Sequence, residues 1–302
     1  PQYLLLIMTS PTTLADFAWA PHVPDSIDGM PLATSISDLV WTFPYDRLPT
    51  NVVVASLLRP ELVVLAVVLY LNSKKPLQKL CKDLGITGKS ATFTTLVALH
   101  NLTLAIFSGV VAVNAWLLTI HHYRTNGLNQ TAYCDTEYKL WNSGFGSWAT
   151  IFYLSKFFEY IDTWILVMKG KNVSFLQIFH HTGVALNMWG GVLSQGAWMQ
   201  APVLLNSIIH TFMYTYFFIK TIRPDLQIRA AKYLTTAQIG QFFLGIVGIL
   251  PMAVIGQECD SAAARFSLVS SEVYAGILIL LFADFASKKY RNKKKMKLAK
   301  KM

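Results

Sequence analysis

Three clusters of residues in this chain have the types and spacing that acid–base or nucleophilic chemistry requires. They are Lys156-x-x-Glu159-x-x-Asp162, His180-His181 and His210. A neutral imidazole is basic and nucleophilic near neutral pH, and a neighbouring carboxylate fixes its tautomer and raises its basicity. The clusters therefore predict a catalytic site made of histidines and carboxylates.

Helical geometry gathers further polar side chains onto the faces that carry these clusters. At 100° per residue, the four polar residues between Lys156 and Thr163 share an arc of about 120°. Gln177 joins the histidine pair within an arc of about 100°. Asn206, Tyr214 and Tyr216 are the polar residues around His210, and Met213 shares a face with His210, Asn206 and Tyr214. Gln238 and Gln241 follow further along the chain.

The composition places these residues in a membrane protein. Of the 302 residues, 53% are hydrophobic and 14% are charged, whereas soluble domains carry about 25% charged residues. The apolar residues form long blocks, which is typical of polytopic helical membrane proteins. The net charge of +10 does not indicate nucleic-acid binding, because the basic residues lie in loops between the apolar blocks and in a C-terminal run.

A membrane-spanning helix needs about 20 mostly apolar residues. On that criterion we expect an all-α fold with seven transmembrane helices at about 52–71, 94–120, 146–168, 175–195, 198–220, 233–256 and 266–286. Arg59, Pro60 and Glu61 interrupt the first of them. We expect three regions, namely a lumenal arm at 1–50, the seven-helix domain at 51–287 and a basic cytosolic tail at 288–302.

The distribution of Lys and Arg predicts the orientation of these helices. One side of the seven spans carries 20 of these residues in its loops and tail, and the other side carries 4. Positive residues collect on the cytosolic side of membrane proteins. The C-terminus is therefore expected in the cytosol and the N-terminus in the lumen or outside the cell.

The polar residues are also expected at a common depth. Ionisable residues within a span cost about 2.5–3.5 kcal/mol each, so they indicate function. Asp162 and Tyr214 lie six residues before the cytosolic ends of their spans, and His180 and Gln238 lie five residues after the starts of theirs. At 1.5 Å per residue, all four lie roughly 8–9 Å below the cytosolic interface. The outer half of the bundle is expected to be nearly apolar apart from small hydroxyl groups.

Some of these residues also have a purely structural interpretation. Lys156 and Glu159 can neutralise each other as a pair three residues apart on one helix. Gln238 and Gln241 can form hydrogen bonds between helices.

Two further histidine positions are not expected to take part in chemistry. His100 is expected to be a packing residue. His121 and His122 end the second span near the lumenal interface, where we expect solvated side chains.

The cysteines and one sequon fit the same topology. Cys134 and Cys259 fall in lumenal loops and Cys81 in a cytosolic loop. Because the lumen permits oxidation, we expect a Cys134–Cys259 disulfide, with two free thiols as the alternative. Asn129 begins a lumenal Asn-Gln-Thr sequon and is the predicted glycosylation site.

Four ordered motifs in the chain resemble those of a known family. They are Lys156-x-x-Glu159-x-x-Asp162-Thr163, Phe175-Leu-Gln177-x-x-His180-His181, Asn206-x-x-x-His210-x-x-Met213-Tyr214-x-Tyr216 and Thr235-x-x-Gln238-x-x-Gln241. Together they look like the motifs of the ELO family of very-long-chain fatty acid elongases. Gln177, where the family usually has His, is similar to the microbial and algal elongases of polyunsaturated chains. Phe217 replaces a second tyrosine that usually ends the third motif.

The resemblance implies a multi-pass protein of the endoplasmic reticulum, in which six of seven helices form a barrel around a tunnel for the acyl chain. It implies the condensation of a long-chain acyl-CoA with malonyl-CoA to 3-oxoacyl-CoA, CoA and carbon dioxide, with no metal or organic cofactor. The usual partners of the family are the 3-ketoacyl-CoA reductase, the dehydratase and the enoyl reductase of the elongation cycle. The oligomeric state is open, with a homodimer as one candidate.

The residues permit a route through an acyl-imidazole, with His180 as the preferred nucleophile. No cysteine lies in the expected spans to take that part. In this hypothesis His181 or His210 orients the nucleophile or acts as acid–base, while Asp162 and Glu159 fix an imidazole tautomer. Developing oxyanions accept hydrogen bonds from Gln177, Asn206, Tyr214 and Gln238. The CoA phosphates are attracted by Lys156 and by the loop bases Lys169, Lys171, Arg223, Arg229 and Lys232. Met213, Tyr216 and Gln241 complete the predicted substrate-binding set. For the loop bases, control of topology is the alternative.

Two other classes of membrane protein compete with this interpretation. A di-iron desaturase or hydroxylase needs about eight histidines as metal ligands, and the chain has seven, three of them on the expected lumenal side. A seven-helix receptor or transporter is the alternative without catalysis. A transporter would carry polar groups through the full depth of the membrane.

Overall fold

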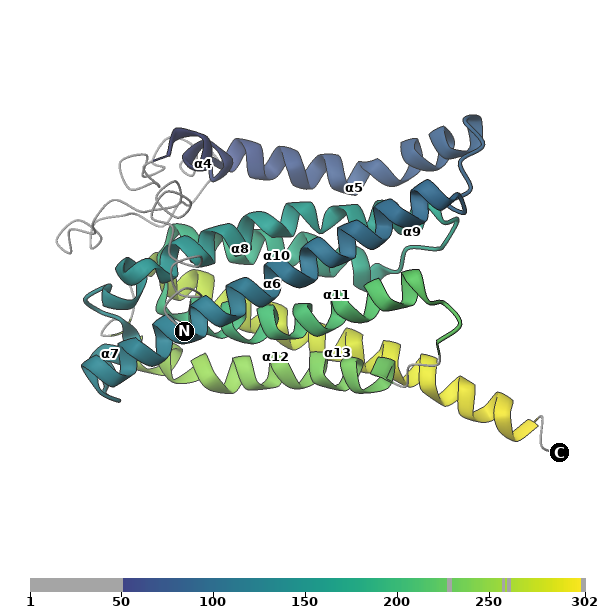
Figure 1. The fold of residues 1–302 in the computed structure, drawn as a ribbon. Coiled ribbons are helices and arrows are strands. Elements are labelled where there is room, and N and C mark those ends of the chain that lie inside the picture. The colour runs from purple at the N-terminus through teal and green to yellow at the C-terminus, as the bar shows by residue number, and fades with distance from the viewer. Residues whose placement is uncertain (1–50, 227–229, 257–258, 260–261, 300–302) are drawn as a thin grey trace, which may run out of the picture.

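The computed structural model describes residues 51–226, 230–256, 259 and 262–299, and the regular structure in these ranges is entirely helical (Figure 1). In chain order the elements are α4 (Val52–Leu57), α5 (Pro60–Asp83), α6 (Ala91–Asn126), α7 (Gln130–Cys134), the π-helix η3 (Trp141–Phe145), α8 (Gly146–Phe158), α9 (Tyr160–Met168), α10 (Phe175–Leu193), the 3₁₀ helix η4 (Ala197–Met199), the π-helix η5 (Pro202–Asn206), α11 (Ser207–Ile222), α12 (Ala230–Ile255) and α13 (Ala262–Ala299). The expected N-terminal arm lies outside the described residues.

The first expected span is wrong in its boundaries. Arg59 has an extended backbone, and Pro60 opens α5 as its first residue. A proline disfavours the helical conformation in the residue before it, yet it suits the first position of a new helix. The apolar run therefore divides into α4 and the longer α5. At the other end of the chain, α13 continues through the expected tail to Ala299 without a break at position 288.

Within the described residues, four helices are long and apolar enough to cross a membrane, by length and composition. They cover Ala91–Asn126, Ala197–Ile222, Ala231–Ile255 and Ala264–Lys289. The protein is therefore a multi-pass membrane protein. The expected span at 146–168 is divided between α8 and α9, and α10 carries several of the polar site residues within its 19 residues. Because of the division at Glu159 and the polar residues of α10, neither segment is among the long apolar helices.

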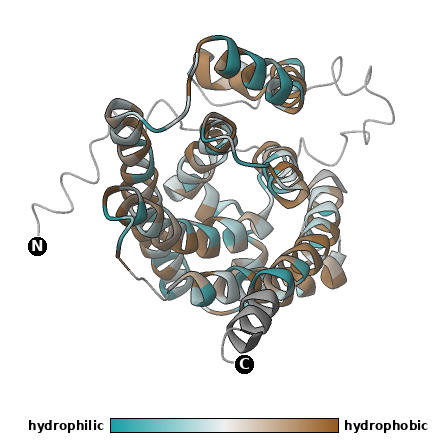
Figure 2. Ribbon diagram, turned by 90° about the vertical axis from the view of Figure 1, so that its right-hand side faces the viewer, coloured by the Kyte–Doolittle hydropathy of each residue, from teal (hydrophilic) through white to brown (hydrophobic). Residues whose placement is uncertain are grey.

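Neighbouring helices form a closed series of contacts. α6 packs against α11, α11 against α12, α12 against α13, α13 against α10, and α10 against α8. α8 and η3 in turn contact α6. Seen end-on, these helices run around the axis of the bundle, while α5 lies outside the series against α9 and α10 (Figure 2).

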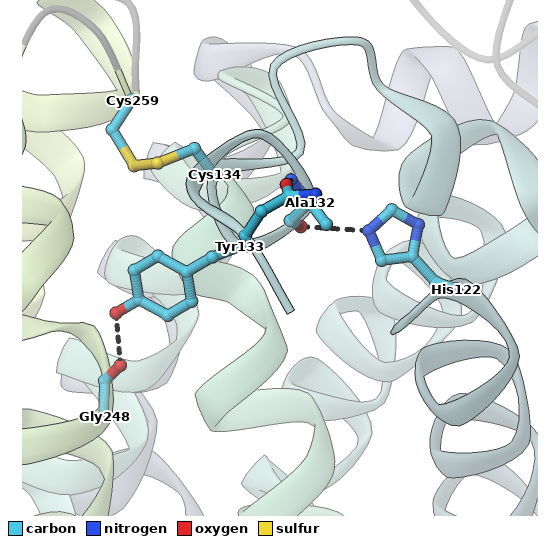
Figure 3. The surroundings of a disulfide bond; sticks show 7 residues. His122, Ala132, Tyr133, Cys134, Gly248 and Cys259 are labelled. Atoms are coloured by element: carbon cyan, nitrogen blue, oxygen red, sulfur yellow. Dashed lines mark hydrogen bonds between the residues drawn. A yellow bond between two sulfur atoms is a disulfide. The ribbon is translucent and has the colours of Figure 1, made fainter. Parts of the chain in front are cut away.

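A disulfide ties the end of the bundle that we expect in the lumen. Cys134 of α7 and Cys259, which follows α12, are joined with an S–S distance of 2.06 Å (Figure 3). The hydroxyl of Tyr133 donates to the carbonyl oxygen of Gly248 beside them. This link fastens the loop after α6 to the hairpin between α12 and α13. The free cysteine of the described residues, Cys81, is buried in α5.

The expectation that His121 and His122 are both solvated is wrong for His122. Its ring is 4% exposed, and Nε2 lies 2.9 Å from the carbonyl oxygen of Ala132 (Figure 3). The side chain therefore packs α6 against α7. Asn129 is exposed and caps α7, since its Oδ1 accepts from the N–H of Ala132, while its Nδ2 donates to Asn126. Glycosylation at Asn129 stays a prediction.

Candidate active site

A buried charged cluster forms where the polypeptide turns between α8 and α9. Glu159 stands at this turn. Its Oε1 accepts from the ammonium of Lys156 at 2.8 Å and lies 3.3 Å from Nδ1 of His210. The ammonium of Lys156 also donates to Oδ1 of Asn206 at 3.3 Å and lies over the ring of Phe152. Lys156 is 0% and Glu159 2% exposed, so the pair is held by the surrounding protein and not by water.

Asp162 organises a second group across three helices. Its Oδ1 lies 2.8 Å from Nε2 of His100 on α6, and its Oδ2 accepts from the hydroxyl of Tyr214 on α11 at 2.6 Å. The expectation that His100 is a packing residue is therefore wrong. Its place six residues into its expected span is the same depth that singled out Asp162, so this signal was present in the sequence.

Thr163 links a third group that contains one histidine of the pair. The hydroxyls of Thr163 and Tyr70 lie 2.9 Å apart, and the amide of Gln177 donates to Thr163 at 3.4 Å. The same amide nitrogen lies 2.7 Å from Nε2 of His181. Donation by the amide leaves the ring proton of His181 on Nδ1. Ser174 caps α10 at the N–H of Gln177, which fixes the start of the helix and the rotation of this face.

His180 is held by its backbone and has a free ring nitrogen. Its carbonyl oxygen accepts from the hydroxyl of Tyr274 on α13 at 2.8 Å, and its ring stacks on His181 at 5.5 Å between centroids. The ring of Tyr274 lies over Gly183, where an added Cβ would come within 2.2 Å of it. Glycine at position 183 therefore lets α13 approach closely enough to hold His180. Nδ1 of His180 is buried and has no hydrogen-bond partner in the described part of the chain.

His180 lines a mostly apolar pocket. It is lined by residues of α10, η5, α12 and α13, among them Asn206, Gln241 and Glu272. Buried polar atoms without partners are rare in native proteins and call for an explanation. Here Nδ1 of His180, Oε1 of Gln241 and Oε1 of Glu272 all lack a partner among the described residues, and all three residues line this pocket. A ligand that fills the pocket would supply partners to such atoms.

The remaining predicted site residues differ in their contacts with the histidine and carboxylate groups. Gln238 donates to the sulfur of Met213 at 3.3 Å and so joins α12 to α11. Tyr216 is half-buried with its ring against Phe217 and is not one of the residues that link the histidines. The expectation of an outer half without charged groups is wrong, because Glu272 lies in α13 within the pocket.

The loop bases predicted to attract phosphates are only partly brought to one place. Lys169 is close to the ring of Phe93, and burial, followed by the like charge of Lys171, lowers its pKa. Arg223 is paired with Asp225. Lys171 and Lys232 are exposed, and Arg229 lies outside the described residues.

Among the described residues, no group of three or more His, Cys, Asp or Glu side chains is placed to hold a metal ion. The rings of His100 and His210 instead contact carboxylates, and that of His181 contacts the amide of Gln177. The arrangement offers nucleophilic and acid–base chemistry beside an apolar pocket.

Comparison with known proteins decides which family has this arrangement. Residues 56–298 match the sequence profile of the ELO family, described as the GNS1/SUR4 family. The chain belongs to the ELO family. The resemblance carried by the four motifs is thereby confirmed at the level of the family.

Several ELO proteins of known name are similar to this chain. A Dictyostelium discoideum protein provisionally named a fatty acid elongase is 35% identical over 202 residues, which cover 65% of this chain and 66% of that protein. Fatty acid elongase sre1 of the same organism is 30% identical over 64% of this chain and 72% of its own length. Long chain fatty acid elongase 2 of Caenorhabditis elegans is 30% identical over 66% of this chain and 73% of its own. This ELO protein is thus similar in sequence to proteins named as fatty acid elongases.

Proposed function

We propose that this ELO protein condenses a long-chain acyl-CoA with malonyl-CoA to give 3-oxoacyl-CoA, carbon dioxide and CoA. The observation that carries the proposal is the position of His180, which lines an apolar pocket and has a buried ring nitrogen without a partner among the described residues. A site of this kind suits an acyl chain buried in the pocket with its thioester at the imidazole. The names of the similar elongases support the same substrate class.

The proposed topology has seven membrane-spanning helices in the endoplasmic reticulum. It adds α5, the divided segment α8–α9 and α10 to the four long apolar helices. Six of the seven then correspond to the closed series of contacts, as a barrel around the acyl tunnel, with α5 outside it. The excess of Lys and Arg on one side places the C-terminus in the cytosol and the N-terminus in the lumen. The three proposed regions keep their boundaries at 1–50, 51–287 and 288–302.

The first half of the proposed reaction transfers the acyl group to His180. The imidazole nitrogen attacks the thioester carbon, the carbon–sulfur bond breaks, and the ring proton passes to the departing sulfur to give CoA. His181 stacks beside the nucleophile, and its tautomer is fixed by Gln177. A fixed tautomer keeps one ring nitrogen of His181 available as a proton donor. The products of this step are an acyl-imidazole and free CoA.

The second half releases carbon dioxide from malonyl-CoA and forms the new carbon–carbon bond. The electron pair of the broken carboxyl bond becomes an enolate, which attacks the acyl carbon and breaks its bond to the ring nitrogen. The ring then takes up the one proton that the overall reaction consumes, which comes from the medium, and the neutral imidazole is restored. Asn206 is held by Lys156, so its amide is positioned to donate to the enolate oxygen. Glu159 holds His210, and Asp162 holds His100 and Tyr214, as a frame for this chemistry.

The substrate that we propose is a polyunsaturated acyl chain, since Gln177 at the start of the histidine motif resembles the microbial and algal subgroup. Gln241, which lines the pocket, and the joined pair Met213–Gln238 belong to the proposed binding set. The proposed partners are the reductases and the dehydratase of the elongation cycle, and a homodimer is the candidate assembly. No metal or organic cofactor takes part in the route.

Replacement of His180 tests the proposed reaction. His180→Ala should lower condensation of acyl-CoA with radiolabelled malonyl-CoA by about 10⁴-fold or more, as removal of a nucleophile does in other enzymes. The exposed His121, replaced by Ala, is the matched control and should keep full activity. Acyl-CoA added without malonyl-CoA should leave one acyl group on the protein by intact mass, and His180→Ala should abolish this adduct. Near-normal condensation by His180→Ala would exclude the nucleophile, and no condensation by the wild type would exclude the function.

A further inference from the structure

Glu272 lines the pocket and has an ionisable side chain, and the proposed reaction gives this side chain no role. It lies on α13, and its Oε1 is buried without a hydrogen-bond partner in the described part of the chain. Much of the lining around it is apolar, including Met188, Ile249 and Leu278. A carboxyl group in such a place costs stability unless something offsets it.

Contacts between α10 and α13 show how far Glu272 lies from His180 along the pocket. The hydroxyl of Tyr274 donates to the backbone of His180, and the hydroxyl of Ser270 donates to Oδ1 of Asn187 at 3.0 Å. Glu272 lies between these two contacts along α13. Asn187 follows His180 by seven residues of α10, which corresponds to about 10 Å. Glu272 therefore faces the pocket up to this distance beyond the nucleophile, where the distal part of a bound chain would lie.

The neighbouring amide does not satisfy Glu272. The Nδ2 of Asn187 donates to the carbonyl oxygen of Gly183 at 2.8 Å, and its Oδ1 accepts from Ser270. An isolated carboxylate is far more costly to bury than the neutral acid. Glu272 is half-buried, and the form that suits its apolar side of the pocket is the carboxylic acid, which has one O–H donor. An acyl chain packed on the apolar lining would lie against this donor.

We propose that Glu272 is a specificity-determining residue that favours acyl chains with cis double bonds at its depth over saturated chains. The π electrons of a double bond accept a weak hydrogen bond from an O–H group, whereas a methylene group accepts none. A contact of this kind changes a rate ratio by a factor of roughly two to five. The inference rests on the proposed function, because it takes the pocket as the site of the acyl chain.

The wild-type protein offers the first test. Monounsaturated acyl-CoAs of one length, with the double bond moved stepwise along the chain, are elongated with radiolabelled malonyl-CoA, each in competition with the saturated chain. We expect kcat/KM to peak roughly twofold to fivefold above the saturated chain for the isomers whose double bond reaches the depth of Glu272. A flat profile along the chain would overturn the proposal.

Variants at position 272 then test whether Glu272 causes the peak in kcat/KM. Glu272→Met has a similar length and no donor, so the peak relative to the saturated chain should disappear. Glu272→Gln keeps an N–H donor and should keep the peak. Val273→Met is the control, because Val273 is 60% exposed on the outside of the same turn. A peak that survives in Glu272→Met would overturn the role of Glu272.

The two levels of the proposal fail in different ways. Condensation by the wild type without any positional preference contradicts the specificity role alone. No condensation of any acyl-CoA contradicts the proposed function, and the subsite falls with it. If Glu272→Met does not fold, the wild-type profile and the Glu272→Gln profile still decide, since a loss of the peak in Glu272→Gln would contradict a role as donor.

Discussion

The buried pair Lys156–Glu159 permits a sharp prediction about stability. Neither side chain is exposed beyond 2%, and His210 shares the same carboxylate oxygen. Removal of one partner of a buried ion pair leaves an uncompensated charge and costs about 3–5 kcal/mol. Lys156→Met should therefore destabilise the protein by this amount, because Glu159 keeps its charge while His210 alone contacts it. At about 2–4 °C per kcal/mol, the unfolding temperature should fall by roughly 6–20 °C.

Thermal unfolding of the purified protein in detergent, followed by size-exclusion chromatography of heated samples, measures this effect. The double variant Lys156→Met with Glu159→Gln removes both charges and should recover most of the lost stability. Lys171→Met, in an exposed loop, is the control and should change the unfolding temperature by less than about 2 °C. A small effect of Lys156→Met alone, or a double variant that loses the sum of the single effects, would refute the reasoning.

The same double variant separates the two interpretations of the pair. If Lys156 and Glu159 only neutralise each other, the folded double variant should condense acyl-CoA and malonyl-CoA at the wild-type rate. If they position Asn206 and His210 for catalysis, the folded double variant should be stable and inactive. We expect the second result, since both charged groups contact residues of the proposed site.

Two further predictions concern His100 and the disulfide. A hydrogen bond to a charged group contributes about 1.5–3 kcal/mol. His100→Ala removes a partner of Asp162 and should therefore lower kcat by about 10–100-fold with little change in KM, and His100→Gln should restore part of the rate. A kcat within twofold of wild type for His100→Ala would show that the contact does not contribute to catalysis. Loss of the disulfide in Cys134→Ser with Cys259→Ser should cost about 2–5 kcal/mol of stability, given the sequence separation of 125 between the cysteines. Reductant should shift the unfolding temperature of wild type but not of the variant. Equal unfolding temperatures with and without reductant would contradict a stabilising link.

Residue types and their spacing along single helices were sufficient to select most of the candidate site. Lys156, Glu159 and Asp162 recur at three-residue intervals, so one helical face could be assigned before any contact was known. Depth in the membrane depends only on position along a span, which is why His180 and Tyr214 were expected in one layer. Glu159 separates α8 from α9 within that stretch, and a local propensity argument does not reveal this division.

Contacts between helices were beyond the reach of the sequence. The pairing of His100 with Asp162 joins residues 62 positions apart, and it depends on how α6 rotates against α9. Hydrophobic periodicity constrains such rotations weakly in a membrane protein, because lipid and protein interior are both apolar. The burial of His122 and the place of Glu272 in the pocket follow from the same packing and were likewise missed.

The sequence by itself determined that the chain is a helical membrane protein of the ELO family, and it predicted histidines, carboxylates and amides at one depth. Periodicity and apolar length depend on neighbours along the chain, so they can be read locally. Only the tertiary structure decided which acid holds which imidazole, which residues line the pocket and which polar atoms face it, because these depend on the relative rotation and register of helices far apart in the chain.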